Sequence, residues 1–64
     1  MKYEYILQVR DANGAWYEHS RFLARNNEHS RFVALDRDIP EHWQILHDDT
    51  VIHEKQTHFK SEPY

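Results

Sequence analysis

Histidines and the carboxylates near them are the first side chains of this sequence that could support chemistry. Four of the six histidines recur at intervals of five, six and five residues, namely His42, His47, His53 and His58. If His47 and His53 lay on adjacent strands, Asp48 or Asp49 could complete a zinc site with them. The intervals match no standard zinc motif, so we interpret these histidines as surface residues. We expect neither a metal nor any other cofactor.

Two histidine–serine neighbours suggest nucleophilic catalysis at first sight, His19 with Ser20 and His29 with Ser30. Consecutive side chains of a strand point to opposite faces, and adjacent residues of a helix do not face each other. Neither pair is therefore expected to form the hydrogen-bonded dyad that such catalysis needs. A chain of 64 residues also has little room for a pocket that excludes water. We expect that the protein is not an enzyme.

Acidic side chains offer a different kind of site, one that imitates the phosphates of DNA for an enzyme that binds DNA. The candidates are Glu28, Asp36, Asp38, Glu41, Asp48 and Asp49. The alternative interpretation is a solvated helix face followed by acidic turns. The formal net charge of −3 argues against direct nucleic-acid binding, because that requires a basic face. Cations and aromatic rings in the first 25 residues could form a single-strand platform, but interleaved acidic residues favour core packing instead.

The N-terminal end of the chain is predicted to form a β-hairpin. Apolar and polar residues alternate over 3–10, and Asn13-Gly14 follows, which is a strong hairpin signal. A two-residue loop would pair Val9 with Glu18. We favour a three-residue loop with Gly14 left-handed, which pairs Val9 with Tyr17 and Leu7 with His19. This register puts Tyr17 and Leu23 on the apolar face of the first strand, with Tyr5, Leu7 and Val9.

A helix of two to three turns is predicted over 28–37, with Asn26 or Asn27 as its N-cap. Phe32 and Leu35 are three residues apart and share one face. Because so short a helix is unstable in water, we expect it to pack on the hairpin. The pentapeptide Glu-His-Ser-Arg-Phe occurs at 18–22, in the predicted second strand, and again at 28–32, in this helix.

The remainder of the chain permits two interpretations. The residues 38–41, Asp-Ile-Pro-Glu, match a capping box and could start a second helix over 40–47. We favour a loop followed by strands at 43–47 and 50–54. The fold class is then α+β, a small antiparallel sheet of three or four strands with one helix packed across it, in the order ββαβ or ββαββ. We expect a single domain over 1–54 and a flexible C-terminal tail over 55–64.

Size and composition bear on the partners of the chain. A single domain of 64 residues without cysteine buries a modest share of its surface, so association with a second copy is expected, giving a homodimer. The sequence lacks the apolar region of a signal peptide and the roughly 18 apolar residues of a membrane span. We therefore expect a cytoplasmic protein with no membrane partner.

The N-terminal hairpin resembles that of the small phage-encoded uracil-DNA glycosylase inhibitors, which are acidic ββαβ dimers. Their tyrosine-led strand ends in Leu-Gln, acidic residues precede a glycine turn, and a Tyr-Tyr-Glu segment follows. The counterparts here are Tyr3 to Gln8, Asp11 to Gly14, and Trp16-Tyr17-Glu18, and the resemblance extends over roughly 3–52. The family's helix presents a Phe-Glu pair and a later Tyr to the enzyme. This helix carries Glu28 and Phe32 but no Phe-Glu-x-x-Tyr.

The resemblance implies a small inhibitor that binds a host nucleic-acid enzyme, uracil-DNA glycosylase first of all, by mimicking DNA. Its carboxylates would lie where DNA phosphates lie, and its aromatics would receive an apolar loop of the enzyme. The partner-binding residues would be Glu28, Phe32, Tyr17, Trp16 and Asp36. A ββαβ pattern also resembles phage inhibitors of host RNA polymerase. The alternatives are therefore an inhibitor of another host enzyme, a self-associating structural or regulatory module with no enzyme target, or a nucleic-acid-binding module.

Overall fold

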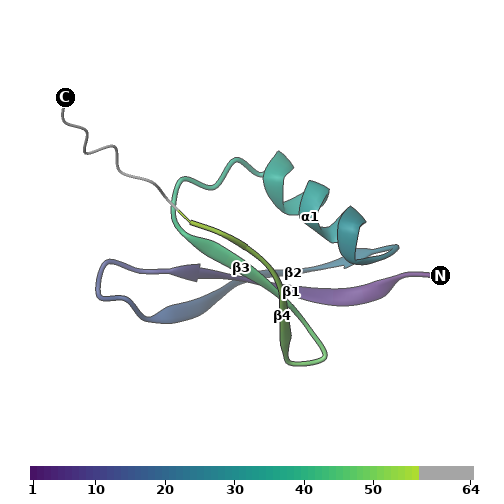
Figure 1. The fold of residues 1–64 in the computed structure, drawn as a ribbon, viewed down its shortest axis with the longest axis horizontal. Coiled ribbons are helices and arrows are strands. Elements are labelled where there is room, and N and C mark those ends of the chain that lie inside the picture. The colour runs from purple at the N-terminus through teal and green to yellow at the C-terminus, as the bar shows by residue number, and fades with distance from the viewer. Residues whose placement is uncertain (57–64) are drawn as a thin grey trace.

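A four-stranded antiparallel sheet with one helix on one of its faces forms the fold, which confirms the α+β prediction (Figure 1). The computed structural model describes residues 1–56. The elements follow the order ββαββ, namely β1 (Tyr3–Arg10), β2 (Trp16–Ala24), α1 (Asn27–Asp36), β3 (Trp43–His47) and β4 (Thr50–Lys55). The strand order across the sheet is β2-β1-β3-β4, so β2 and β4 are the edge strands.

The turn between β1 and β2 has the predicted three-residue loop. Gly14 has φ +86°, a left-handed conformation that glycine adopts at no steric cost. The Asp11 carboxylate accepts hydrogen bonds from the amides of Asn13 and Ala15, both at 2.9 Å. The Asp11 amide donates to the Ala15 carbonyl at 2.9 Å, which closes the loop. Gly14 and Asp11 together therefore fix the start of the β1–β2 register.

The register beyond this turn is only partly as predicted. Val9 pairs with Tyr17, as expected, but Leu7 pairs with Ser20 rather than with His19. A β-bulge places His19 as an extra residue in β2, and every later side chain of β2 changes face. The placement of Leu23 on the apolar face was therefore wrong. Phe22, which pairs with Tyr5, lies on that face instead.

The helix begins at the predicted N-cap and packs on the sheet through its small residues. The Asn26 side chain caps it by accepting the His29 amide at 2.8 Å. Its buried residues are Ser30 and Ala34. Phe32 is 54% exposed and Leu35 is 42% exposed, so the helix packs on the sheet through the face that carries Ser30 and Ala34 and not through the face that carries Phe32 and Leu35. Small residues allow the helix backbone to approach the sheet closely, and that contact decides which face of α1 is covered.

The second half of the chain forms the two predicted strands, and residues 40–47 do not form a helix. A two-residue turn of Asp48 and Asp49, with φ +52° and +63°, joins β3 to β4. The β4 strand extends to Lys55, whose ammonium group donates to the Ile39 carbonyl at 2.9 Å. The rest of the predicted tail, 57–64, lies outside the described residues. No helix within 1–56 is long and apolar enough to span a membrane.

The core lies between α1 and the sheet face that α1 covers. Its buried apolar residues are Tyr5, Leu7, Val9, Ala24, Ala34, Ile39, Trp43 and Ile45. Burial raises the pKa of the Tyr5 phenol, with smaller contributions from Tyr3 and Asp48. The Tyr5 hydroxyl donates to Asn27 Oδ1 at 3.0 Å and so ties the first turn of α1 to β1. The opposite face of the sheet, here called the open face, has no helix of residues 1–56 over it (Figure 1).

Candidate partner-binding surface

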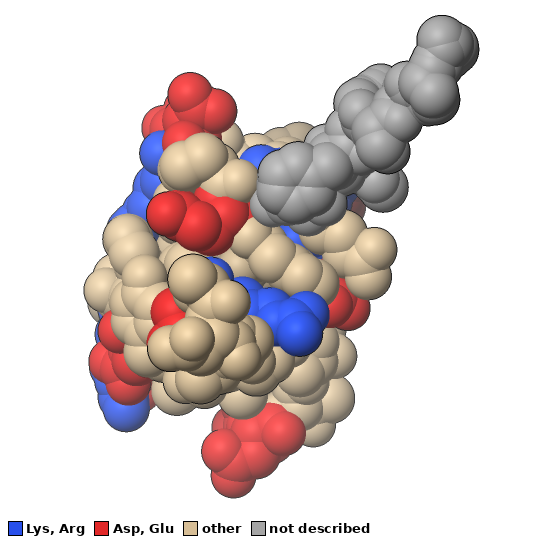
Figure 2. All heavy atoms as spheres, turned by 90° about the vertical axis from the view of Figure 1, so that its left-hand side faces the viewer, with Lys and Arg blue, Asp and Glu red and all other residues tan. Residues whose placement is uncertain are grey.

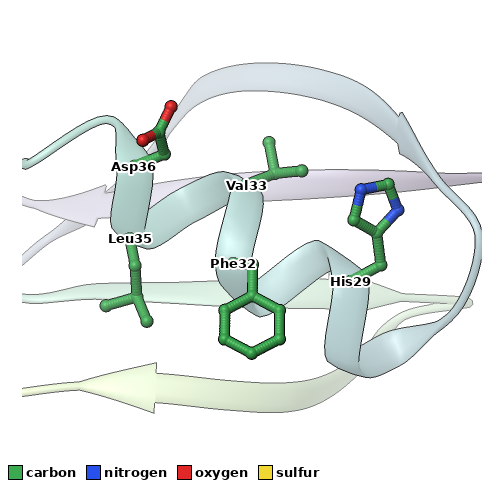
Figure 3. A pocket seen from close by; sticks show the side chains of 5 residues that line it. All are labelled: His29, Phe32, Val33, Leu35 and Asp36. Atoms are coloured by element: carbon green, nitrogen blue, oxygen red, sulfur yellow. The ribbon is translucent and has the colours of Figure 1, made fainter.

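The outward side of α1 carries two exposed apolar side chains. Phe32 and Leu35 point to the same side of the helix (Figure 3), and both are exposed, whereas Ser30 and Ala34 are buried. They line a shallow hollow of about 550 Å³ together with His29, Val33 and Asp36. We call the exposed residues Glu28, Phe32, Leu35 and Asp36 the helix surface.

Two carboxylates flank Phe32 on this surface. Glu28, Phe32 and Asp36 are spaced four residues apart, so they follow one stripe of the helix. Glu28 lies in the first turn, where the helix dipole stabilises a negative charge. Asp36 lies in the last turn, where the dipole opposes a negative charge, and this turn contains no basic residue. The position of Asp36 therefore has no advantage for the helix itself.

The structure does not bring Trp16 and Tyr17 to the helix surface. Tyr17, 47% exposed, lines a separate hollow near the β1–β2 turn, together with Pro40, Glu41 and His42 among others. Trp16 is half-buried, and its ring lies edge-on to His42 with 5.2 Å between centroids. Of the five predicted partner-binding residues, Glu28, Phe32 and Asp36 thus share one surface, and the two aromatics of β2 belong elsewhere.

The six acidic residues proposed as a phosphate track come from three segments. Glu28 and Asp36 are on α1, Asp38 and Glu41 are in the loop before β3, and Asp48 with Asp49 forms the β3–β4 turn. On the face seen in Figure 2, acidic side chains form separate groups with basic side chains between them. The described residues on this face of the molecule therefore form no continuous acidic track.

The histidines within residues 1–56 are engaged in separate contacts, and His58 of the histidine series lies outside the described residues. His53 Nε2 lies 3.0 Å from the Asn27 carbonyl, and His47 stacks on the Tyr5 ring at 4.6 Å. Within residues 1–56 no three histidine or acidic side chains are arranged to hold a metal ion.

One expectation about the histidine–serine neighbours was wrong. His19 Nδ1 lies 3.3 Å from Ser20 Oγ, because the bulge at His19 breaks the alternation that should have separated them. The Ser20 hydroxyl also accepts a hydrogen bond from the Arg37 guanidinium at 2.5 Å. The His19 side chain is exposed to solvent. Proximity alone therefore does not give this pair the buried, oriented base that an activated serine requires.

Two residues of the hollow were not among the predicted partner-binding residues. Leu35 follows Phe32 by three residues, which indicates that the two side chains share a face. His29 follows the N-cap by three residues, and its Nδ1 accepts the Arg25 amide at 3.0 Å. Only the orientation of α1 identifies both as surface residues.

Comparisons with known proteins do not assign the chain to a family. Neither the protein-family models, nor the curated proteins, nor the solved structures contain a match to it.

Proposed function

We propose that this chain is a small cytoplasmic inhibitor that binds a host nucleic-acid enzyme, in the first place a uracil-DNA glycosylase, and occupies its DNA-binding site. The observation that supports the proposal is the helix surface, where the exposed Phe32 lies between Glu28 and Asp36. An exposed aromatic anchor with charges at its rim is the usual composition of an interface hot spot.

The two kinds of side chain would have different roles. Carboxylates at Glu28 and Asp36 would be attracted to the basic groove that normally holds phosphates, which speeds association and fixes orientation. Phe32 and Leu35 would contact an apolar part of the enzyme beside that groove. The surface suits a partner more than it suits the fold, because a phenylalanine exposed to water contributes little to the stability of α1.

The acidic turns supply a second argument. All three non-glycine residues with positive φ among the described residues are aspartates, namely Asp38, Asp48 and Asp49. Asparagine or glycine would adopt this conformation at least as readily. A carboxylate at each of these turns is therefore of more use to a basic partner than to the backbone.

The proposal is tested by calorimetric titration of the chain into a purified bacterial uracil-DNA glycosylase. We expect binding that competes with an oligonucleotide substrate, and no binding of the chain to duplex DNA. Phe32→Ser should weaken binding at least about tenfold, as loss of a hot-spot anchor does. Glu28→Gln and Asp36→Asn keep the shape and remove charge, so each should weaken binding and reduce its salt dependence.

Ala15→Ser is the control, because Ala15 is exposed in the β1–β2 turn, outside both the helix surface and the open face. It should bind as the parent chain does. Absence of binding to the glycosylase would contradict the proposal. Binding to a host RNA polymerase instead would mean that the helix surface inhibits that enzyme. Tight binding of the chain to duplex DNA would favour a nucleic-acid-binding module.

A further inference from the structure

The open face of the sheet carries charged and apolar side chains in a defined register. Strand pairing aligns four rows across it, in order along the strands. The first contains Leu23 and Glu4; the second Arg21, Ile6, Leu46 and Val51; the third Glu18, Gln8, Gln44 and Glu54; and the last Trp16 and Arg10, followed by His42, whose carbonyl accepts the Arg10 amide at 2.9 Å. These rows lie opposite the helix because successive side chains of a strand alternate between faces.

The charged residues of β1 and β2 in these rows are complementary to themselves when the strand direction is reversed. Consider a second copy facing this one, related by a two-fold axis that lies between the sheets and perpendicular to the strands. Each strand then covers its own counterpart in the opposite direction, and the axis passes over the row of Leu7, Ser20 and Ile45. Glu4 would face Arg10 of the second copy, and Arg21 would face Glu18 of the second copy. Leu23 would face the indole of Trp16. Ile6, Leu46 and Val51 would face Gln8, Gln44 and Glu54 of the second copy.

Polar groups on the open face are already paired within the chain, which lowers the cost of covering them. The Arg21 guanidinium contacts the Glu18 carboxylate at 2.9 Å and the Glu4 carboxylate at 3.6 Å, and these acids raise the pKa of Arg21. The Gln44 amide donates to Gln8 Oε1 at 2.7 Å.

The apolar side chains of this face are incompletely covered in a single copy. Ile6 and Leu46 are half-buried, Leu23 is 59% exposed and Val51 is 47% exposed. These side chains supply apolar area that association would remove from water.

Edge-to-edge association is opposed by the same structure. Both edge strands carry a register shift, β2 at His19 and β4 at Ile52. A bulge twists an edge and interrupts its row of free amides and carbonyls, which discourages pairing with another chain. A second copy would therefore approach through the open face rather than through an edge.

We propose that the open face is the interface of an isologous homodimer, in which the two sheets stack face to face with Glu4 of each copy opposite Arg10 of the other. This arrangement is a symmetric contact of the kind that most homodimers use. It leaves both copies of the helix surface exposed, so the dimer and the proposed inhibitor function use different faces.

A charge exchange between two variants tests this geometry in the full chain. Glu4→Lys places like charges opposite each other at both ends of the interface, and so does Arg10→Glu. The dimer dissociation constant of each variant alone should be at least about tenfold higher than that of the parent chain, because like charges that face each other oppose association. An equimolar mixture of the two variants should restore the parent affinity, since the Glu4→Lys copy and the Arg10→Glu copy would then present opposite charges to each other.

Sedimentation equilibrium from 1 to 200 µM, at low salt, is the measurement, with circular dichroism to verify folding; these concentrations are on the scale of moderate dimer affinities. Glu4 and Arg10 are six residues apart on one strand, about 20 Å, so restoration by mixing cannot arise within a single chain. A parent chain that is monomeric at 200 µM overturns the proposal, and so do variants that remain dimeric or a mixture that stays dissociated. If Phe32→Ser dissociated the dimer instead, the dimer interface would be the helix surface, and the proposal would be wrong.

Discussion

Single residues define this fold at the points where the backbone leaves its ordinary conformation. Gly14 takes the left-handed conformation that the β1–β2 loop requires, and the Asp11 side chain stabilises that loop with two hydrogen bonds. The one-residue bulge at His19 then decides which side chains of β2 face the core. Gly14 is evident from the sequence, because Asn-Gly is a hairpin signal; the bulge is not, because it depends on how the β2 side chains fit under α1.

Gly14→Val should lower the free energy of unfolding by at least about 1 kcal/mol, since a β-branched residue tolerates positive φ poorly. Steric contact adds little, because the nearest atoms to a new Cβ belong to the flexible Arg10 side chain, the closest at 3.2 Å. Gly14→Asn is the control and should cost less, since asparagine adopts this conformation more readily. Urea unfolding of the three proteins measures both differences, and equal stability of all three would contradict the proposed role of the turn.

The raised pKa of Tyr5 predicts that the protein loses stability in alkaline solution. The pKa of Tyr5 is raised in the folded protein, so the folded state resists deprotonation. The contribution of Tyr5 is therefore complete below its ordinary pKa of 10.0 and is lost as the pH rises above that value. Unfolding midpoints between pH 8 and 11 should fall less steeply in Tyr5→Phe than in the parent chain. If the unfolding midpoints of the two proteins fell in parallel with pH, the Tyr5 phenol would not contribute to the loss of stability in alkaline solution.

At the scale of elements, α1 is defined locally but oriented by the sheet. The pentapeptide Glu-His-Ser-Arg-Phe forms strand at 18–22 and helix at 28–32, so these five residues do not choose their own structure. The second copy follows the capping residue Asn26, which starts a helix. Caps, turns and strand alternation are local signals, and they predict the ββαββ order. Which face of α1 is covered depends on the distance to the sheet, and no local signal contains that distance.

Two substitutions on α1 separate the covered side from the exposed side. Ala34→Leu should lower the free energy of unfolding by about 1–3 kcal/mol, because Ala34 is fully buried and a larger side chain overpacks the contact with the sheet. Phe32→Ser should change it by no more than about 0.5 kcal/mol, as is usual for an exposed position. Thermal unfolding followed by circular dichroism compares them. A larger loss for Phe32→Ser than for Ala34→Leu would contradict the orientation of the helix.

At the scale of the whole molecule, the two sides of the sheet carry different kinds of surface. The helix side presents Phe32 and Leu35 between carboxylates, whereas the open face presents charged residues of β1 and β2 that match their own reversal. The sequence predicted Glu28, Phe32 and Asp36 as partner-binding residues, and the structure places all three on one stripe of α1. Trp16 and Tyr17 could not be separated from that group by sequence alone, because their distance from α1 follows from the twist of the sheet and the path of the loop before β3.

Uracil excision from a labelled oligonucleotide by a bacterial uracil-DNA glycosylase tests the proposed inhibitor function most directly. Excision should fall in proportion to the amount of chain added up to the equimolar point. At tenfold excess of the chain no excision should remain. Phe32→Ser, verified as folded by circular dichroism, should restore excision at the equimolar point, whereas Ala15→Ser should inhibit as the parent chain does. Full excision at tenfold excess of the parent chain would contradict the account.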